Sequence, residues 1–277
     1  MLAQRIITAV VLLVLIVPSI FFAPIWIWGL VSLVMLCAAG FEWGRLLGSV
    51  RAGAVLGALL AILGAAYIAW RGEVPVPPAP ALVAVLCAVS LVFWVSIGPM
   101  SLSRVHQVGP GWAIGALVLS ACWVALYELR IESSAFLVSA MAIVWLADIG
   151  AYFSGRSLGR HKLAPRVSPG KTWEGVAGGV VAVLACAAAL AQWLPDAADR
   201  IFSSHLASHL GWPLAALVLA IIAVISVVGD LYESLLKRLA GVKDSGRTLP
   251  GHGGVLDRID ALIPTMPGCL LLLQLLR

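Results

Sequence analysis

The stretch WPLAALVLAIIAVISVVGDL, residues 212–231, indicates the fold class of this chain. Its first eighteen residues carry no charged side chain, and twenty helical residues extend about 30 Å, the thickness of a bilayer's hydrocarbon core. Comparable apolar runs recur along the 277 residues, of which 62% are hydrophobic. A water-soluble domain has about 45–50% apolar residues. We therefore expect an all-α, polytopic helical membrane protein.

The apolar runs predict about nine transmembrane helices. They lie at residues 6–22, 25–40, 52–70, 80–98, 111–127, 134–153, 175–194, 212–231 and 258–276. An odd number of spans places the termini on opposite sides of the membrane. With this topology, 14 of the 18 Lys and Arg residues share the side of the N-terminus, and the positive-inside rule makes that side cytoplasmic.

The chain divides into two regions by loop character. Residues 1–133 have short loops and look like an N-terminal scaffold of transmembrane helices, whereas residues 134–277 look like the catalytic region, with cytosolic loops at 154–174 and 232–257. The five cysteines all lie in apolar runs without C-x-x-C spacing, so we expect neither disulfides nor a zinc site. The net charge of +5 follows from topology and the loops and does not indicate nucleic-acid binding.

Two aspartates stand where predicted spans end. Asp148 lies in WLADIGAYFSGRSLGR and Asp230 in VVGDLYESLLKR. An ionised group at membrane depth costs at least about 2.5–3.5 kcal/mol unless it faces water or a partner, so such residues indicate a functional site. The alternative is that each aspartate sits one turn beyond the hydrocarbon, in the interface.

The most polar part of the chain precedes its last apolar run. Residues 234–260 read SLLKRLAGVKDSGRTLPGHGGVLDRID and hold eight charged side chains and one histidine. Gly251, Gly253 and Gly254 allow backbone N–H groups to approach an anion closely before a helix start. His252 lies between these glycines, where its imidazole could reach a phosphate or a metal.

Paired carboxylates in this segment suggest a cation. Asp257 and Asp260 are three residues apart at the start of the last predicted helix, which places both side chains on one face. Two carboxylates about 4 Å apart repel by about 1–4 kcal/mol, so gathering them with Asp230 requires a counter-cation. Oxygen ligands without His or Cys favour Mg²⁺. Alternatively, the aspartates pair only with Arg247 and Arg258.

A second basic segment, RHKLAPRVSPGKTWEG at residues 160–175, leads into a helix that we expect to begin at Thr172. Its PGKT letters invite comparison with a phosphate-binding P-loop, but residue 165 is proline instead of the required glycine and we expect no preceding strand. Phosphates with Mg²⁺ suit this mixture of acids, bases and glycines. Contact with anionic lipid headgroups is the alternative, and it explains the lysines but not the aspartates or glycines.

The order of residues from Ser234 to Asp260, S-x-x-K-R-x-x-x-x-K-D-x-G-x-x-x-P-G-H-G-G-x-x-D-R-x-D, closely resembles the signature of the phosphatidate cytidylyltransferases, or CDP-diacylglycerol synthases. Asp148 to Pro165 and Ser168 to Gly175 are similar to further segments of that family. The resemblance implies transfer of CMP from CTP to phosphatidic acid in phospholipid biosynthesis, giving CDP-diacylglycerol and pyrophosphate. It also implies dependence on Mg²⁺, and K⁺ as a second ion in the metal centre is a further expectation from the family.

The resemblance assigns roles to these residues as a hypothesis. Asp230 and Asp257 hold the metal. Asp260 supports it either as a further ligand or by contacting the residues that bind the metal directly. The expected catalytic set is Asp230, Asp257, Asp260, Lys237 and Arg238. The expected substrate-binding set is Asp148, Ser168, Lys171, Lys243, Asp244, Arg247, His252, Gly253, Gly254 and Arg258.

The implied surroundings are those of an integral protein of the bacterial inner membrane whose active site faces the cytoplasm, and a homodimer is the family expectation. Two other functions stay open on the residues alone. A transporter would use intramembrane Asp148 and Asp230 to bind a coupling ion, and a CTP-dependent lipid kinase would transfer the γ-phosphate in place of CMP.

Overall fold

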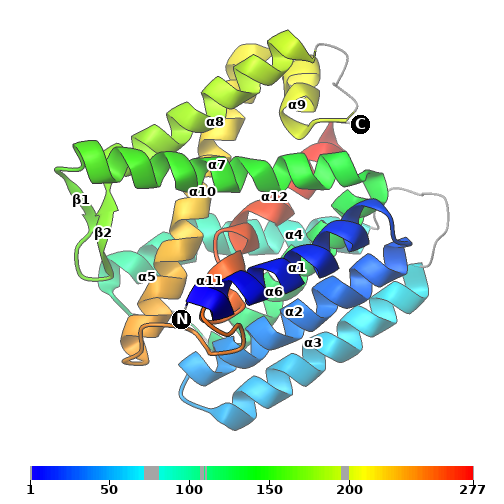
Figure 1. Ribbon diagram of the computed structural model, residues 1–277, viewed down its shortest axis with the longest axis vertical. Helices are drawn as coiled ribbons and strands as arrows, with labels where there is room; N and C mark the ends of the chain where they lie inside the picture. The colour runs from blue at the N-terminus through cyan, green and yellow to red at the C-terminus, as the bar shows by residue number, and fades with distance from the viewer. Residues whose placement is uncertain (1, 72–80, 107–108, 110, 195–199, 277) are drawn as a thin grey trace.

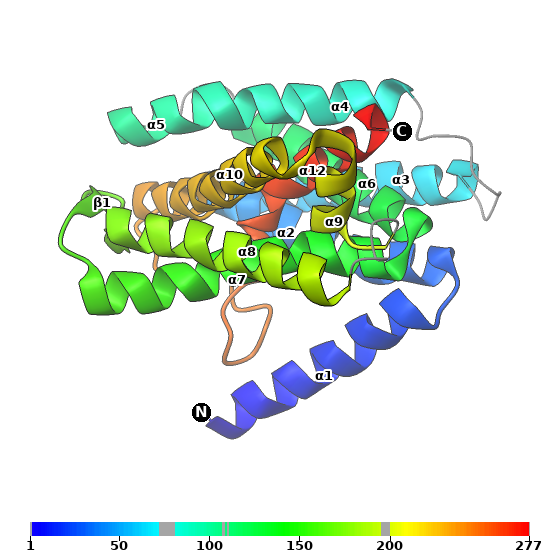
Figure 2. The same ribbon diagram turned by 90° about the horizontal axis from the view of Figure 1, so that it is seen from above.

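The computed structural model describes residues 2–71, 81–106, 109, 111–194 and 200–276 (Figures 1 and 2). Within these ranges, eight helices are long and apolar enough to cross a membrane, which confirms the all-α, polytopic class. They are α1 (Leu2–Phe21), α2 (Ile25–Leu46), α3 (Val50–Arg71), the run of α4 (Ala81–Val92), η1 (Phe93–Ile97) and α5 (Gly98–Arg104), α6 (Gly111–Glu132), α7 (Ser134–Leu158), α8 (Trp173–Trp193) and α10 (Trp212–Leu239).

The ninth predicted span is not one helix. The short α11 (Leu256–Ile259) precedes α12 (Leu262–Leu275), whose 14 residues extend about 21 Å. The break falls at Asp260, whose carboxylate accepts a hydrogen bond from the Ala261 amide at 2.8 Å. Pro264 has no N–H to donate to the carbonyl of Asp260, four residues earlier. The prediction of a continuous helix from 258 was therefore wrong at this point.

Two helices continue well past the ends predicted for them. α7 reaches Leu158 and α10 reaches Leu239, so Asp148 and Asp230 lie within helices and not at their ends. Beyond Asp230, buried residues 232, 235 and 236 keep the spacing of one helical face. A span predicted from hydropathy ends where charged residues begin, whereas an amphipathic helix continues as long as one of its faces is buried.

The basic segment of residues 160–175 forms a structure that the sequence did not predict. Strands β1 (Lys162–Ala164) and β2 (Ser168–Thr172) pair as an antiparallel hairpin. Strand β1 precedes the PGKT letters, so the expectation of no preceding strand was wrong. The letters themselves lie in β2, and an extended strand is not a phosphate-binding loop. Thr172 is the N-cap of α8, since its hydroxyl accepts from the Gly175 amide at 3.1 Å. The predicted helix start is confirmed.

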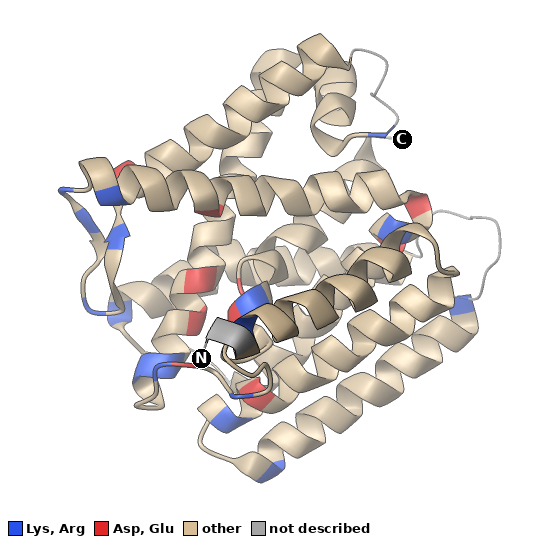
Figure 3. Cartoon of the chain, viewed as in Figure 1, with Lys and Arg blue, Asp and Glu red and all other residues tan. Residues whose placement is uncertain are grey.

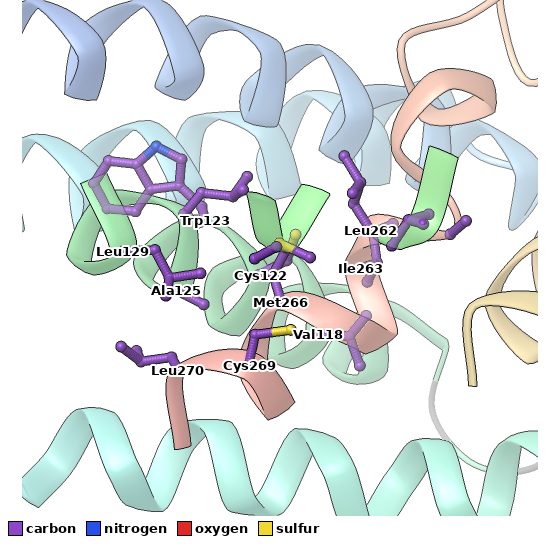
Figure 4. Close-up of a cluster of buried hydrophobic side chains, with 14 of the residues drawn as sticks. Val118, Cys122, Trp123, Ala125, Leu129, Leu262, Ile263, Met266, Cys269 and Leu270 are labelled. Atoms are coloured by element: carbon purple, nitrogen blue, oxygen red, sulfur yellow. The ribbon is translucent and has the colours of Figure 1, made fainter. Parts of the chain in front are cut away.

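The helices pack as antiparallel neighbours, with α2 beside α3 and α7 beside α8 (Figure 1). The short α9 (Phe202–Leu210), also not predicted, contacts α7 and α10. α12 packs against α6, where Met266 and Cys269 of α12 meet Val118 and Cys122 of α6 (Figure 4). Helices of residues 1–133 and 134–277 therefore share one buried core.

Candidate active site

Most charged segments gather at one end of the bundle (Figure 3). Figure 3 shows acidic segments on α7 and α10, and most basic segments near the β1–β2 hairpin and the loop after α10. The loop of residues 240–255 joins α10 to α11. The charged residues separate into two neighbouring groups, one around Asp230 and one around Asp257.

The first group surrounds Asp230. Lys171, in β2, places its Nζ 2.6 Å from Asp230 Oδ2, and both side chains are partly exposed. Asp148 of α7 and Asp260 lie within electrostatic range of this ion pair. Three carboxyl groups thus lie within electrostatic range of one ammonium.

Beside this group is a polar cavity of about 580 Å³. Asp148, Ser168, Lys171 and Asp230, all predicted from the sequence, line it. The lining also includes Tyr152, Arg156, Gly170 and Thr172, which sequence reasoning missed. Arg156 donates to the Tyr152 hydroxyl at 2.9 Å, one helical turn away. The i,i+4 spacing within DIGAYFSGR was the signal that could have found this pair.

The second group surrounds Asp257. Lys237 Nζ lies 2.8 Å from Asp257 Oδ1 and 2.5 Å from Oε2 of Glu233, which is only 2% exposed. Asp257 also accepts hydrogen bonds from the Ser245 amide at 3.1 Å and the Gly254 amide at 2.8 Å. Burial alone would raise the pKa of Asp257, but its hydrogen bonds with Glu233, Lys237 and the Gly254 amide hold that pKa well below its usual range. Asp257 is therefore ionised at neutral pH.

The two aspartates at the start of the last helix point into different surroundings. Asp257 meets Lys237 and the 240–255 loop, whereas Asp260 meets Asp230 and Asp148. Glu233 lies between the groups, in electrostatic contact with both Asp257 and Asp260. Asp260 keeps helical backbone angles (φ −50°, ψ −44°), so the two aspartates differ in their partners although the backbone stays helical at Asp260.

Other predicted residues hold the loops in place. Arg238 donates through Nε to the Val167 carbonyl at 3.2 Å, which ties α10 to the hairpin. Arg258 donates to the His252 carbonyl at 2.6 Å through Nη2. Lys243, Asp244 and Arg247 are exposed in the loop after α10. Their contacts with substrate stay a prediction.

The glycines of this loop serve its own folding. Gly251 and Gly253 have φ values of +78° and +87°, a region that side chains disfavour. A Cβ on Gly254 would overlap the Ser245 hydroxyl and the carboxylate of Glu42. Glu42 lies in α2, and sequence reasoning missed it because nothing in the sequence connects α2 with this loop.

The donor chemistry of the first group fits a hard divalent cation. Asp148, Asp230 and Asp260 offer only oxygen, and Mg²⁺ commonly uses one or two carboxylates and completes its shell with water and substrate phosphates. Among the described residues, no three His, Cys, Asp or Glu side chains already lie close enough to enclose a metal ion. The oxygens of Asp257 are occupied by protein donors, so its contacts do not favour direct ligation. Metal binding stays a prediction.

An apolar groove of about 610 Å³ adjoins the polar cavity, and the two share Val176 and Val227 in their walls. Leu163, Trp173, Val224 and Leu231 are among its apolar walls, with Arg166 and Ser103 as polar exceptions. A charged cavity continuous with an apolar groove suits a ligand that is anionic at one end and hydrocarbon at the other.

Comparison with known proteins identifies the family of this chain. The model of the cytidylyltransferase family matches residues 3–276. A phosphatidate cytidylyltransferase of Pseudomonas aeruginosa is 38% identical over 96% of this chain and 95% of its own length. Proteins of the same name from Haemophilus influenzae and Staphylococcus epidermidis are 49% and 40% identical over 45% and 51% of this chain, and over 41% and 50% of their own lengths. The chain belongs to the cytidylyltransferase family.

Proposed function

We propose that this protein transfers CMP from CTP to phosphatidic acid, giving CDP-diacylglycerol and pyrophosphate. The observation that carries the proposal is the polar cavity around Lys171 and Asp230 beside an apolar groove, in a chain of this family. The cavity suits the phosphates, and the groove suits the acyl chains of the lipid. The relative from Pseudomonas aeruginosa bears the name of this activity.

The reaction joins two anions. A phosphate oxygen of phosphatidic acid forms a bond to the α-phosphorus of CTP, and the bond from that phosphorus to the bridging oxygen of the β-phosphate breaks, so pyrophosphate leaves. A phosphate monoester has a second pKa near 6 and is largely dianionic at neutral pH. It therefore needs no strong general base, and holding the two reactants in line against their repulsion is the main task of the protein.

The protein's residues divide this task. Lys171 binds and orients a phosphate in the cavity, and Arg156, which also lines the cavity, supplies a second positive charge. Asp148, Asp230 and Asp260 would hold Mg²⁺, which when bound supplies positive charge to the reacting phosphates. The predicted additional K⁺ would occupy the same acidic surroundings. Lys237 is held between Glu233 and Asp257. Its role is therefore to position Asp257 and the loop, and it contacts a phosphate only if substrate displaces one of these carboxylates.

The experiment that tests the function uses purified protein with phosphatidic acid and CTP labelled at either the α- or the γ-phosphate. Cytidylyl transfer carries the α label into the lipid and releases the γ label as pyrophosphate. A lipid kinase would carry the γ label into the lipid instead. Transport of an ion without label transfer would support the transporter alternative.

Orientation and assembly belong to the same proposal. We infer an integral protein of the bacterial inner membrane with its active site on the cytoplasmic side, supported by the 14 basic residues on one predicted face and by bacterial relatives. The homodimer is supported by the family resemblance. Labelling of single cysteines placed in the loop 240–255 from either side of sealed vesicles tests orientation, and the mass in detergent tests assembly.

A further inference from the structure

One fully buried carboxylate lies outside the group that lines the cavity. Glu42, in α2, has 0% exposure. It is more than 200 residues distant in sequence from the loop that it contacts. A buried charge must be compensated by partners, because an uncompensated one costs several kcal/mol.

Among the described residues, four hydrogen-bond donors surround the Glu42 carboxylate, and they come from the loop and the start of α11. The Leu256 amide donates to Oε2 at 2.8 Å and the Val255 amide to Oε1 at 3.1 Å. The Ser245 hydroxyl lies 3.1 Å from Oε2, and the Thr248 hydroxyl donates to Oε1. The middle of the loop and its C-terminal end are thus tied to the same side chain.

The loop has the shape needed to close around this carboxylate. Gly246 and Gly254 pack so closely on Glu42 that a Cβ at either position would overlap it. The close packing on the Glu42 carboxylate therefore explains why residues 246 and 254 are glycines. The backbone N–H groups of residues 255 and 256 are occupied by it.

The contacts continue from Glu42 to the second charged group. The Ser245 hydroxyl lies between Glu42 Oε2, at 3.1 Å, and Asp257 Oδ2, at 3.0 Å. The Gly254 amide, next to the amides that Glu42 binds, donates to Asp257. Asp257 in turn pairs with Lys237. The position of Asp257 and Lys237 therefore depends on where Glu42 holds the loop.

We propose that Glu42 is a positioning residue for cytidylyl transfer, which it supports from α2 by holding residues 245–256 so that Asp257 keeps its contacts with Lys237 and Glu233. This inference rests on the proposed function. Glu42 touches neither reactant, and its effect is transmitted through Ser245, Gly254 and Asp257.

The test compares Glu42→Gln with Glu128→Gln. Glu128 is another buried carboxylate of the N-terminal region, and in the part of the chain that the structure describes it pairs with Arg71 and Tyr67 and makes no hydrogen bond to the loop. The glutamine at 42 keeps the shape of the side chain, but its amide nitrogen cannot accept from backbone N–H groups. Steady-state kinetics, melting temperature in detergent and hydrogen exchange are measured on both variants.

We expect Glu42→Gln to lower kcat/KM by about 10- to 100-fold, as the loss of partners for buried backbone donors implies. Amides of residues 244–257 should exchange faster by a similar factor, while exchange in α6 and α12 stays unchanged. Glu128→Gln should lower the melting temperature without faster exchange in 244–257. A merely structural role for Glu42 would give the pattern of Glu128.

The proposal is overturned if Glu42→Gln keeps kcat/KM within about twofold, or if its activity falls only with the melting temperature while exchange at 244–257 is unchanged. Should Glu42→Gln not fold, Thr248→Val removes one donor from the loop and leaves α2 intact. It should lower kcat/KM by about 3- to 10-fold, and full activity would then overturn the proposal. If unmodified protein carries no α label into lipid, the proposed function fails, while the exchange experiment still decides whether Glu42 holds the loop.

Discussion

Replacing Lys171 by methionine removes the cation that pairs with Asp230. Methionine keeps the length and apolar stem of the side chain, so the change is mainly one of charge. Lys171 Nζ lies 2.6 Å from Asp230 Oδ2, and 23% of the lysine side chain is exposed. The substitution leaves the carboxylates of Asp148, Asp230 and Asp260 without their basic neighbour, and an incoming triphosphate meets a more negative cavity.

The size of the effect follows from the partial exposure of Lys171. A charge about 4 Å from a phosphate oxygen contributes about 1 kcal/mol in water and about 4 kcal/mol at an effective dielectric near 20. A side chain about three-quarters buried lies between these limits. Because about 1.4 kcal/mol corresponds to a factor of ten, kcat/KM should fall by about 5- to 1,000-fold.

The assay follows α-labelled CTP into lipid at saturating Mg²⁺, with Lys171→Arg as the matched control that keeps the charge. We expect the arginine variant to retain more activity than the methionine variant, and both to melt near the temperature of the unmodified protein. A methionine variant within about twofold of the unmodified kcat/KM would refute the view that this ammonium holds a reacting phosphate.

Three further predictions concern the metal, the loop and the scaffold. Chelation should abolish label transfer and added Mg²⁺ should restore it, whereas transfer that persists in excess chelator would contradict the proposed use of Asp230 and Asp260. Asp257→Asn should lower turnover strongly in folded protein. Since the pKa of Asp257 is lowered in the folded state, its contribution to stability is fully present above about pH 4. The difference in free energy of unfolding between this variant and unmodified protein should be level from about pH 5 to 8 and shrink in more acidic solution. Arg71→Met should destabilise the bundle by about 3–5 kcal/mol, because it leaves buried Glu128 without its cation, and denaturation in detergent measures this.

Most of the helices were predictable because each depends on a local property. The apolar runs predicted the membrane helices, and Thr172 predicted the start of α8. The ends of α7 and α10 were not predicted. A hydropathy profile falls where charged residues begin. In α10 these charged residues occupy one face of a helix whose other face is still buried, as at Tyr232 and Leu236.

The sequence predicted many of the residues of the site, but not which of them contact one another. Asp148, Ser168, Lys171 and Asp230 do line one cavity, as their shared polarity suggested. Asp257 and Asp260 were expected on one face, and in the structure they have different neighbours. The glycines were expected to surround a substrate anion, yet Gly254 packs on Glu42.

By itself the sequence determined that the chain is a helical membrane protein and that its charged segments resemble those of a cytidylyl-transferring family. Hydropathy and residue order are written along the chain, so no contact between distant segments is needed to read them. Only the tertiary structure decided which carboxylate meets which donor. Glu42 of α2 reaches Leu256 across more than 200 residues, because hydrogen bonds depend on the position and direction of two groups in space, which helix packing sets.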